Sequence, residues 1–218
     1  MNGEELRNTS QKHHYYGDTN AQSQGRAPRL SSPRYLHGHS DLVTAIRLCP
    51  EFGVAVTAAE DGSVITWDLH SLQYLHHIVI PGQTASSTSL VADISSKSGE
   101  IAVAADSTLH LMTINLKPVC QVAVTERITA VTFSNQEEGV SINCVAVGLN
   151  TGLVKLFSSL DLALLRDLVG APASPVTALT YSEDSQNLSV ASLDGTLTIL
   201  EKSGKDGMNK TPKYVTLQ

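Results

Sequence analysis

The feature that most constrains the fold of this chain is a pattern of about 45 residues that occurs four times. In its most complete copy, Gly38-His39 precedes apolar runs at residues 43–46 and 54–57, and the turn Asp61-Gly62 precedes a third run ending at Trp67-Asp68. Short apolar runs separated by turn residues predict β-strands. A unit this small cannot bury its apolar faces alone, so its copies must stack against one another.

Two independent markers define the period. The turn after the second apolar run recurs at Asp61, Asp106, Thr151 and Asp194, in steps of 45, 45 and 43 residues. The first run of each copy begins at residues 43, 91, 128 and 176, in steps of 48, 37 and 48 residues. One Asp-Gly turn would indicate only a hairpin. Two markers that recur together four times indicate a repeat architecture.

A unit of about 40 to 45 residues with Gly-His early and Trp-Asp late resembles the WD repeat. The resemblance implies an all-β chain: a partial WD-repeat β-propeller with about four blades, each a four-stranded sheet. A β-sandwich also has strands at short intervals, but the self-similarity argues against it. The strands are expected at residues 43–48, 53–58, 63–69 and 74–80; 90–95, 100–105, 108–114 and 119–124; 128–133, 142–148, 153–158 and 163–168; and 176–181, 188–192 and 196–201.

The rest of the chain differs in composition from these copies. Residues 1–35 are rich in Asn, Gln, Ser, Gly and Arg with few aliphatics, which predicts a disordered polar arm. Residues 202–218 are a tail, or they supply the last outer strand through residues 214–217. The domains expected are therefore the arm at 1–35, WD repeats over 36–200 (about 36–80, 84–124, 125–169 and 170–201) and the segment 202–218.

Charge and hydropathy exclude several classes of function. Residues 36–200 carry six Lys or Arg against sixteen Asp or Glu. Such an acidic body repels phosphate backbones and anionic lipid heads, so we expect no nucleic acid as a partner. No run of 18 apolar residues exists, which predicts no direct membrane insertion. The odd count of three cysteines, without a CxxC pair, favours reduced thiols.

The first copy holds a set of polar residues that WD repeats join into a hydrogen-bonded network. An indole N–H, a hydroxyl, an imidazole and a carboxylate can pass hydrogen bonds from one to the next. A His–Asp pair beside a hydroxyl also resembles a catalytic triad, but its place within the blade signature favours a structural role. The predicted network consists of Gly38, His39, Thr57, Asp61, Trp67 and Asp68.

The other copies do not keep this network, and no motif for chemistry replaces it. Met112, Phe157 and Leu200 stand at the position of Trp67, and Val190 at that of Thr57. The histidine pairs lack a third ligand at matched spacing, so we expect no metal. Neither a GxSxG nor a GxGxxG motif is present. We therefore predict a protein that is not an enzyme and has no cofactor.

The residues 38–48, Glu60-Asp61-Gly62, Trp67-Asp68-Leu69 and 138–157 resemble the C-terminal WD repeats of BEACH-domain proteins. The resemblance implies a cytoplasmic protein in vesicle or lysosomal trafficking, peripheral to endosomes or lysosomes through its partners. The chain lacks a BEACH domain and has about four repeats where WD propellers have about seven. We therefore expect a fragment or a short form, with missing blades supplied by a partner or by upstream chain.

Loops on a rigid frame carry function, so partner proteins are expected to bind at the loops that join the strands. Asp41 and Glu60, beside the turn of the first copy, are the candidate partner contacts. The alternative is a WD-repeat substrate receptor or signalling scaffold unrelated to membrane traffic. A phosphoinositide-binding propeller is a third hypothesis, but the chain has no adjacent arginines.

Overall fold

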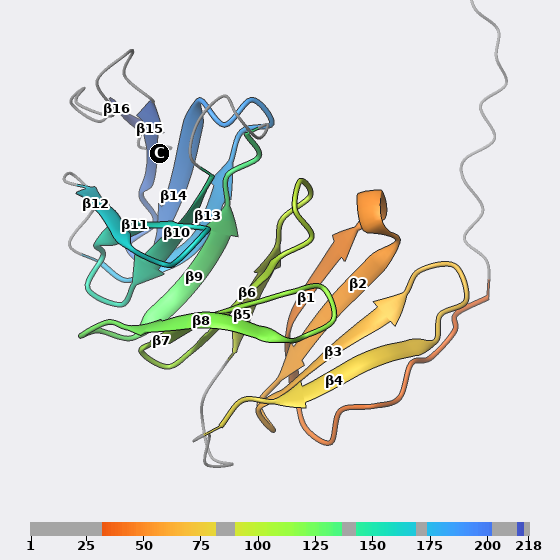
Figure 1. Cartoon of the computed structure of the whole chain (residues 1–218). Coiled ribbons are helices and arrows are strands. Elements are labelled where there is room, and N and C mark those ends of the chain that lie inside the picture. Colours follow the sequence, from red (N-terminus) through yellow and green to blue (C-terminus); the bar gives the residue numbers. More distant parts are fainter. Residues whose placement is uncertain (1–31, 82–89, 137–142, 169–173, 202–212, 216–218) are drawn as a thin grey trace, which may run out of the picture. The chain divides into compact units, whose positions relative to one another are not determined.

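The computed structural model describes residues 32–81, 90–136, 143–168, 174–201 and 213–215, the last three as backbone only (Figure 1). The arm predicted for residues 1–35 lies almost wholly outside these residues. So does most of the segment 202–218.

Four antiparallel sheets, each of four strands in chain order, make up the described part. We call them blades 1 to 4. Blade 1 contains β1 (Val43–Cys49), β2 (Val54–Ala59), β3 (Ser63–Asp68) and β4 (Tyr74–Val79); blade 2 contains β5 (Val91–Ile94), β6 (Ile101–Ala105), β7 (Thr108–Met112) and β8 (Pro118–Ala123). Blade 3 contains β9 (Ile128–Phe133), β10 (Cys144–Leu149), β11 (Val154–Ser158) and β12 (Leu164–Leu168); blade 4 contains β13 (Val176–Tyr181), β14 (Asn187–Ser192), β15 (Leu197–Glu201) and β16 (Lys213–Val215).

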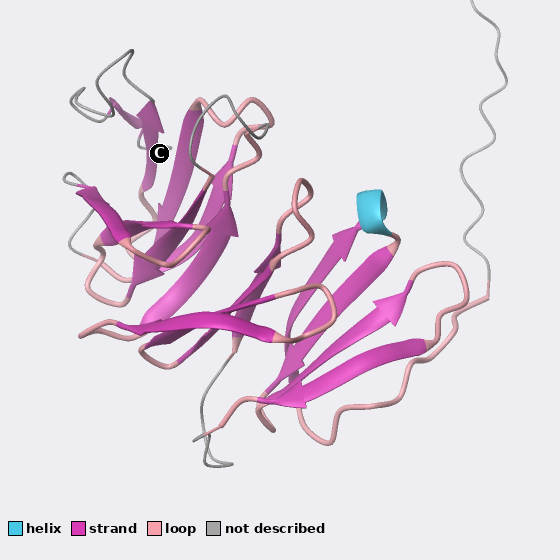
Figure 2. Ribbon diagram, in the orientation of Figure 1, coloured by secondary structure: helices cyan, strands magenta, loops and turns pink. Residues whose placement is uncertain are grey.

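The all-β prediction is confirmed, and every expected strand is present within two residues of its predicted ends. β16 pairs with β15, so the outer strand of blade 4 comes from the C-terminal segment. The one helix among the described residues is the three-residue 3₁₀ turn η1 (Pro50–Phe52) (Figure 2). No helix of the described part is long and apolar enough to cross a membrane.

The described residues form four buried apolar clusters: three are layers between consecutive blades, and the fourth lies on blade 1 around Trp67. The first joins blades 1 and 2 through side chains such as Val56 and Val103, the second joins blades 2 and 3, and the third joins blades 3 and 4. The inner strands β1, β5, β9 and β13 also contact one another in that order. Strands covered on both faces need apolar residues at consecutive positions, as in the fully buried β6 (Ile101–Ala105). The sequence forms this stack because each run is short, apolar and bounded by turns.

A leucine in the left-handed conformation recurs in the turn between the third and fourth strands of blades 1, 2 and 3. Leu72, Leu116 and Leu162 have φ angles of 56°, 56° and 55°. The amide of each donates to a carbonyl three or four residues earlier, which closes the turn. The sequence does not predict this repeated feature, because leucine is not a residue expected at positive φ.

Candidate functional site

The polar network of blade 1 starts at Trp67, whose side chain is 4 % exposed. Its Nε1–H donates to Thr57 Oγ1 at 2.8 Å. Thr57 Oγ1 in turn lies 2.6 Å from Nε2 of His39. The structure therefore brings Trp67, Thr57 and His39 together in the predicted order.

The link from His39 to Asp61 passes through Ser63, which the sequence analysis did not name. His39 Nδ1 lies 2.5 Å from Ser63 Oγ, and that hydroxyl donates to Asp61 Oδ1. Ser63 also donates its backbone N–H to Asp61 at 2.9 Å. Ser63 follows the hairpin turn, so its hydroxyl is buried where the imidazole reaches it. The Asp-Gly-Ser spacing was the available signal.

The donors and acceptors of this network are consistent with a neutral His39. Nδ1–H can donate to Ser63, and Nε2 can accept the proton of Thr57, which already accepts from Trp67. Burial lowers the pKa of His39, and this effect outweighs the attraction of Asp61. Every member then has its partner, which is the condition for a buried polar network to stabilise a fold.

Asp61 is held ionised at the outer end of the network. Burial opposes its charge, but hydrogen bonds from Ser63 and Ser40 outweigh that effect and lower its pKa far below the usual range. Ser40 donates both its N–H and its hydroxyl to Oδ2, at 2.8 and 2.7 Å. The carboxylate thus ties the segment before β1 to the β2–β3 turn.

The order of these groups differs from that of a hydrolytic triad. In a triad the histidine lies between the nucleophilic hydroxyl and the carboxylate. Here Ser63 lies between His39 and Asp61 and donates to the carboxylate, so the imidazole does not take its proton. Ser63 is also buried, away from any substrate. The arrangement joins strands and offers no activated nucleophile.

Gly38 and Asp68 complete the predicted set at its two edges. A Cβ at position 38 would lie 2.8 Å from Ile65 Cδ1 and 3.0 Å from the Trp67 ring, so only glycine lets this segment approach the indole. Asp68 accepts hydrogen bonds from the amides of His70 and Ser71 and closes the β3–β4 turn. The bond to the Ser71 amide is the main cause of its lowered pKa.

Blade 4 keeps only the turn portion of the network. Thr196 donates its N–H and its hydroxyl to Asp194, as Ser63 does to Asp61. Thr57 is replaced by valine in all other blades, at Val103, Val147 and Val190, which occupy the matching place in the strand pairing. The predicted loss outside blade 1 therefore matches the geometry of these strands.

A second candidate site is the end of the sheets where the second and third strands turn. In blades 1, 3 and 4 a backbone bond ties the segment before the first strand to this turn: Glu60 N–H donates to Leu42 O, Asn150 N–H to Arg127 O and Leu193 N–H to Pro175 O. We call this end the loop end. Asp41 and Glu60 both lie there, the first exposed and the second half-exposed.

The loop end is acidic in the described part of the chain. Its carboxylates outside the network are Asp41, Glu60, Asp106, Glu126 and Asp194. Arg127 is the one cationic side chain among its described residues. Blades bring these carboxylates together from positions far apart in sequence, and the resulting field favours a positively charged partner.

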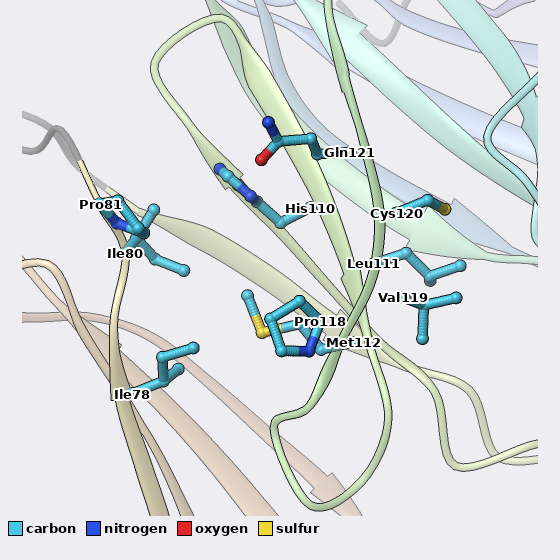
Figure 3. A pocket seen from close by; sticks show the side chains of 10 residues that line it. All are labelled: Ile78, Ile80, Pro81, His110, Leu111, Met112, Pro118, Val119, Cys120 and Gln121. Atoms are coloured by element: carbon cyan, nitrogen blue, oxygen red, sulfur yellow. The ribbon is translucent and has the colours of Figure 1, made fainter.

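A small pocket lies between β4 of blade 1 and β7–β8 of blade 2 (Figure 3). Its volume is about 200 Å³, and its walls include Ile78, Met112 and Val119, with His110 and Gln121 as polar groups. Burial lowers the pKa of His110. Pockets for small ligands measure roughly 300–1,000 Å³, so this one lies below that range. Among the described residues no group of three or more His, Cys, Asp or Glu could hold a metal ion.

Comparison with known proteins agrees with this geometry. The family model for the WD domain, G-beta repeat, matches residues 30–68 and 163–199. The chain is therefore a WD-repeat protein with the β-propeller fold. It is also similar to part of the lysosomal-trafficking regulators of two organisms.

The human lysosomal-trafficking regulator is 37 % identical over 169 residues, which cover 75 % of this chain and 4 % of that protein. The Drosophila melanogaster lysosomal-trafficking regulator is 28 % identical over 232 residues, covering 84 % of this chain and 6 % of that protein. The chain thus spans only a small part of the length of these relatives.

Solved structures show the same fold at lower identity. The β-propeller domain of Cps50 (Swd1) from Myceliophteria thermophila matches with a TM-score of 0.63 and 16 % identity, covering 84 % of this chain and 60 % of that one. The computationally designed Ika4 protein matches with a TM-score of 0.61 and 24 % identity, covering 77 % of this chain and 95 % of that one.

Proposed function

We propose that the chain acts as a non-catalytic protein-interaction scaffold in vesicle and lysosomal trafficking, as the C-terminal part or a short form of a BEACH-type protein. The observation that carries the proposal is the 37 % identity to the human lysosomal-trafficking regulator over three quarters of the chain. The absence of an activated nucleophile in the blade 1 network supports a role in binding. The scaffold works in the cytoplasm and reaches endosomes or lysosomes through its partners.

Partners dock on the loop end, with Asp41 and Glu60 among the contacts. The exposed carboxylates there favour a partner segment rich in Lys and Arg. In the described part of the chain, Asp41 accepts a hydrogen bond only from the neighbouring Leu42 amide, at 2.8 Å, which leaves its second oxygen available. The blades that the four-blade set lacks come from upstream chain or from a partner.

Affinity purification from cells, followed by quantitative mass spectrometry, tests both parts of this proposal. The wild-type chain should recover vesicle and lysosome trafficking proteins, and the double variant Asp41→Lys/Glu60→Lys should recover less of them. Glu183→Lys is the matched control, because Glu183 is exposed in the β13–β14 turn at the opposite end of the sheets. Recovery of ubiquitin-ligase subunits in place of trafficking proteins would instead support the substrate-receptor alternative.

A further inference from the structure

Each blade has an upstream face, toward the preceding blade, and a downstream face, toward the following one. Three positions of the inner strand lie on the upstream face, and in blade 1 they are Val43, Ile46 and Leu48. These side chains are 46 %, 59 % and 61 % exposed. In blades 2 to 4 the equivalent residues, aligned by strand pairing, are at most 8 % exposed: Leu90, Ala92 and Ile94; Ile128, Val131 and Phe133; Val176, Leu179 and Tyr181. The upstream face of blade 1 therefore has the composition of a packed layer.

The downstream face of blade 4 is the counterpart of this face. Its second strand carries Ala191 where the other blades carry Ala58, Ala104 and Gly148. Ala191, Leu197 and Ile199 are half-exposed, whereas the corresponding residues of blade 1, Ala58, Val64 and Thr66, are fully buried against blade 2. This face also has the composition of a packed layer.

A small residue is needed on the downstream face because the next blade inserts a branched side chain there. A Cβ at position 148 would lie 2.5 Å from Cγ1 of Val176, the first residue of β13. Ala104 and Ile128 belong to one buried cluster, and so do Ala58 and Leu90. Among the described residues, Val43 has no small residue of a preceding blade to pack against. Ala191 has no branched side chain of a following blade packed against it.

We propose that a second copy of this chain fills both open faces, with Val43 of each copy packed against Ala191 of the other. The contact is head to tail, and a twofold arrangement of two chains repeats it twice. Two sets of four blades give eight, which lies within the usual range for propellers. One chain carries both faces of this contact, the upstream face of blade 1 and the downstream face of blade 4. Both faces have the residue types that form the three layers between consecutive blades. In this arrangement the partner that supplies the missing blades is a second copy of the chain, whether or not the chain acts in trafficking.

The area left open lies mainly over the inner strands. The outer part of the upstream face, at Ile65 and Trp67, is already covered by the segment that contains Gly38. Contact with a second copy would therefore bury Val43, Ile46 and Leu48 without displacing the network of His39. Exposed apolar surface of this kind marks a protein–protein contact.

Light scattering coupled to size-exclusion chromatography of the 218-residue chain is the first test. The expected mass is twice the chain mass of 23.2 kDa, with dissociation on dilution. Ile46→Asp/Leu48→Asp should weaken the dimer by roughly tenfold or more, because each charge would be buried in an apolar layer. Leu160→Asp is the matched control, since Leu160 is 76 % exposed in the β11–β12 turn, away from both faces.

Engineered cysteines then test the head-to-tail geometry in the wild-type background. A chain with Val43→Cys, mixed with a chain with Ala191→Cys, should form a covalent dimer under mild oxidation, because their Cβ atoms would lie within disulfide reach. The chain without engineered cysteines provides the baseline for Cys49, Cys120 and Cys144. A monomer at every concentration would overturn the proposal. So would cross-linking of the Val43→Cys chain to itself, which would mean a face-to-face contact.

Discussion

Replacing Thr57 by valine should destabilise blade 1 by removing the hydroxyl at the centre of its network. Thr57 Oγ1 accepts from Trp67 at 2.8 Å and contacts His39 at 2.6 Å. Trp67 is 4 % exposed, so water cannot replace the lost acceptor. A buried donor without a partner costs about 1–3 kcal/mol, and valine is nearly the same size as threonine. We therefore expect the free energy of unfolding to fall by about 1–3 kcal/mol.

The assay is urea denaturation followed by tryptophan fluorescence, because Trp67 is the single tryptophan of the chain and reports on blade 1. Thr66→Val, in the adjacent strand β3 of the same blade, is the matched control. Thr66 is completely buried, and its hydroxyl has no hydrogen-bond partner in the described part. Its removal should leave stability unchanged or raise it by up to about 1 kcal/mol.

A double-mutant cycle with Trp67→Phe isolates the Trp67–Thr57 bond. Phenylalanine keeps an aromatic ring but has no N–H, so the second substitution should cost less in the Thr57→Val background than alone. The coupling energy expected is about 1 kcal/mol. Costs that add within about 0.3–0.5 kcal/mol, or equal costs for Thr57→Val and Thr66→Val, would refute the network account.

Two more predictions concern the blade 1 network, and a third concerns the packing of blade 4 on blade 3. The folded state lowers the pKa of His39, so this residue contributes stability above its unfolded pKa of about 6.5. That contribution is lost as the pH falls through the folded pKa. The melting temperature should therefore decline below the unfolded pKa, and it should decline less in His39→Gln. The pKa of Asp61 is also lowered, so the stability difference between the wild type and Asp61→Asn should be full above about pH 4 and shrink as the pH falls further in acid denaturation. Gly148→Ala should lower the free energy of unfolding, measured by urea denaturation, by about 1–3 kcal/mol, because the new Cβ would overlap Val176. Adding Val176→Ala should recover part of that free energy. The absence of any recovery would contradict this packing.

The strands could be predicted from the sequence because each is a short apolar run bounded by turn residues. The burial of Val56 and the exposure of Leu48 depend on the strand pairing within the blade and on whether another blade covers each face. The local sequence pattern does not indicate whether another blade is present. Leu48 and its counterpart Ile94 are similar residues, yet one is exposed and the other buried. Ile94 packs against blade 1, whereas no blade among the described residues precedes Leu48.

The network of blade 1 was predicted only in part, for a physical reason. The structure places His39, Thr57 and Trp67 in one connected set, and it places Ser63 between His39 and Asp61, where the sequence predicted a direct step. Ser63 makes that step because the hairpin turns its hydroxyl inward, and a serine two residues after an aspartate is common in turns without such a role. Contacts across blades were missed as well. Arg47 and Asp93, 46 residues apart, form an ion pair of 3.1 Å that no local pattern indicates.

Hydrogen exchange followed by mass spectrometry tests most directly the claim that the repeats stack as consecutive blades with covered inner layers. At the lowest working concentration, amides of β6 and β10, covered on both faces, should exchange most slowly, and those of β1 faster than those of β9. As the concentration rises, exchange in β1 should slow while that in β6 and β10 stays constant. Fast exchange in β6 and β10, or equal protection of β1 and β9 at every concentration, would contradict the account.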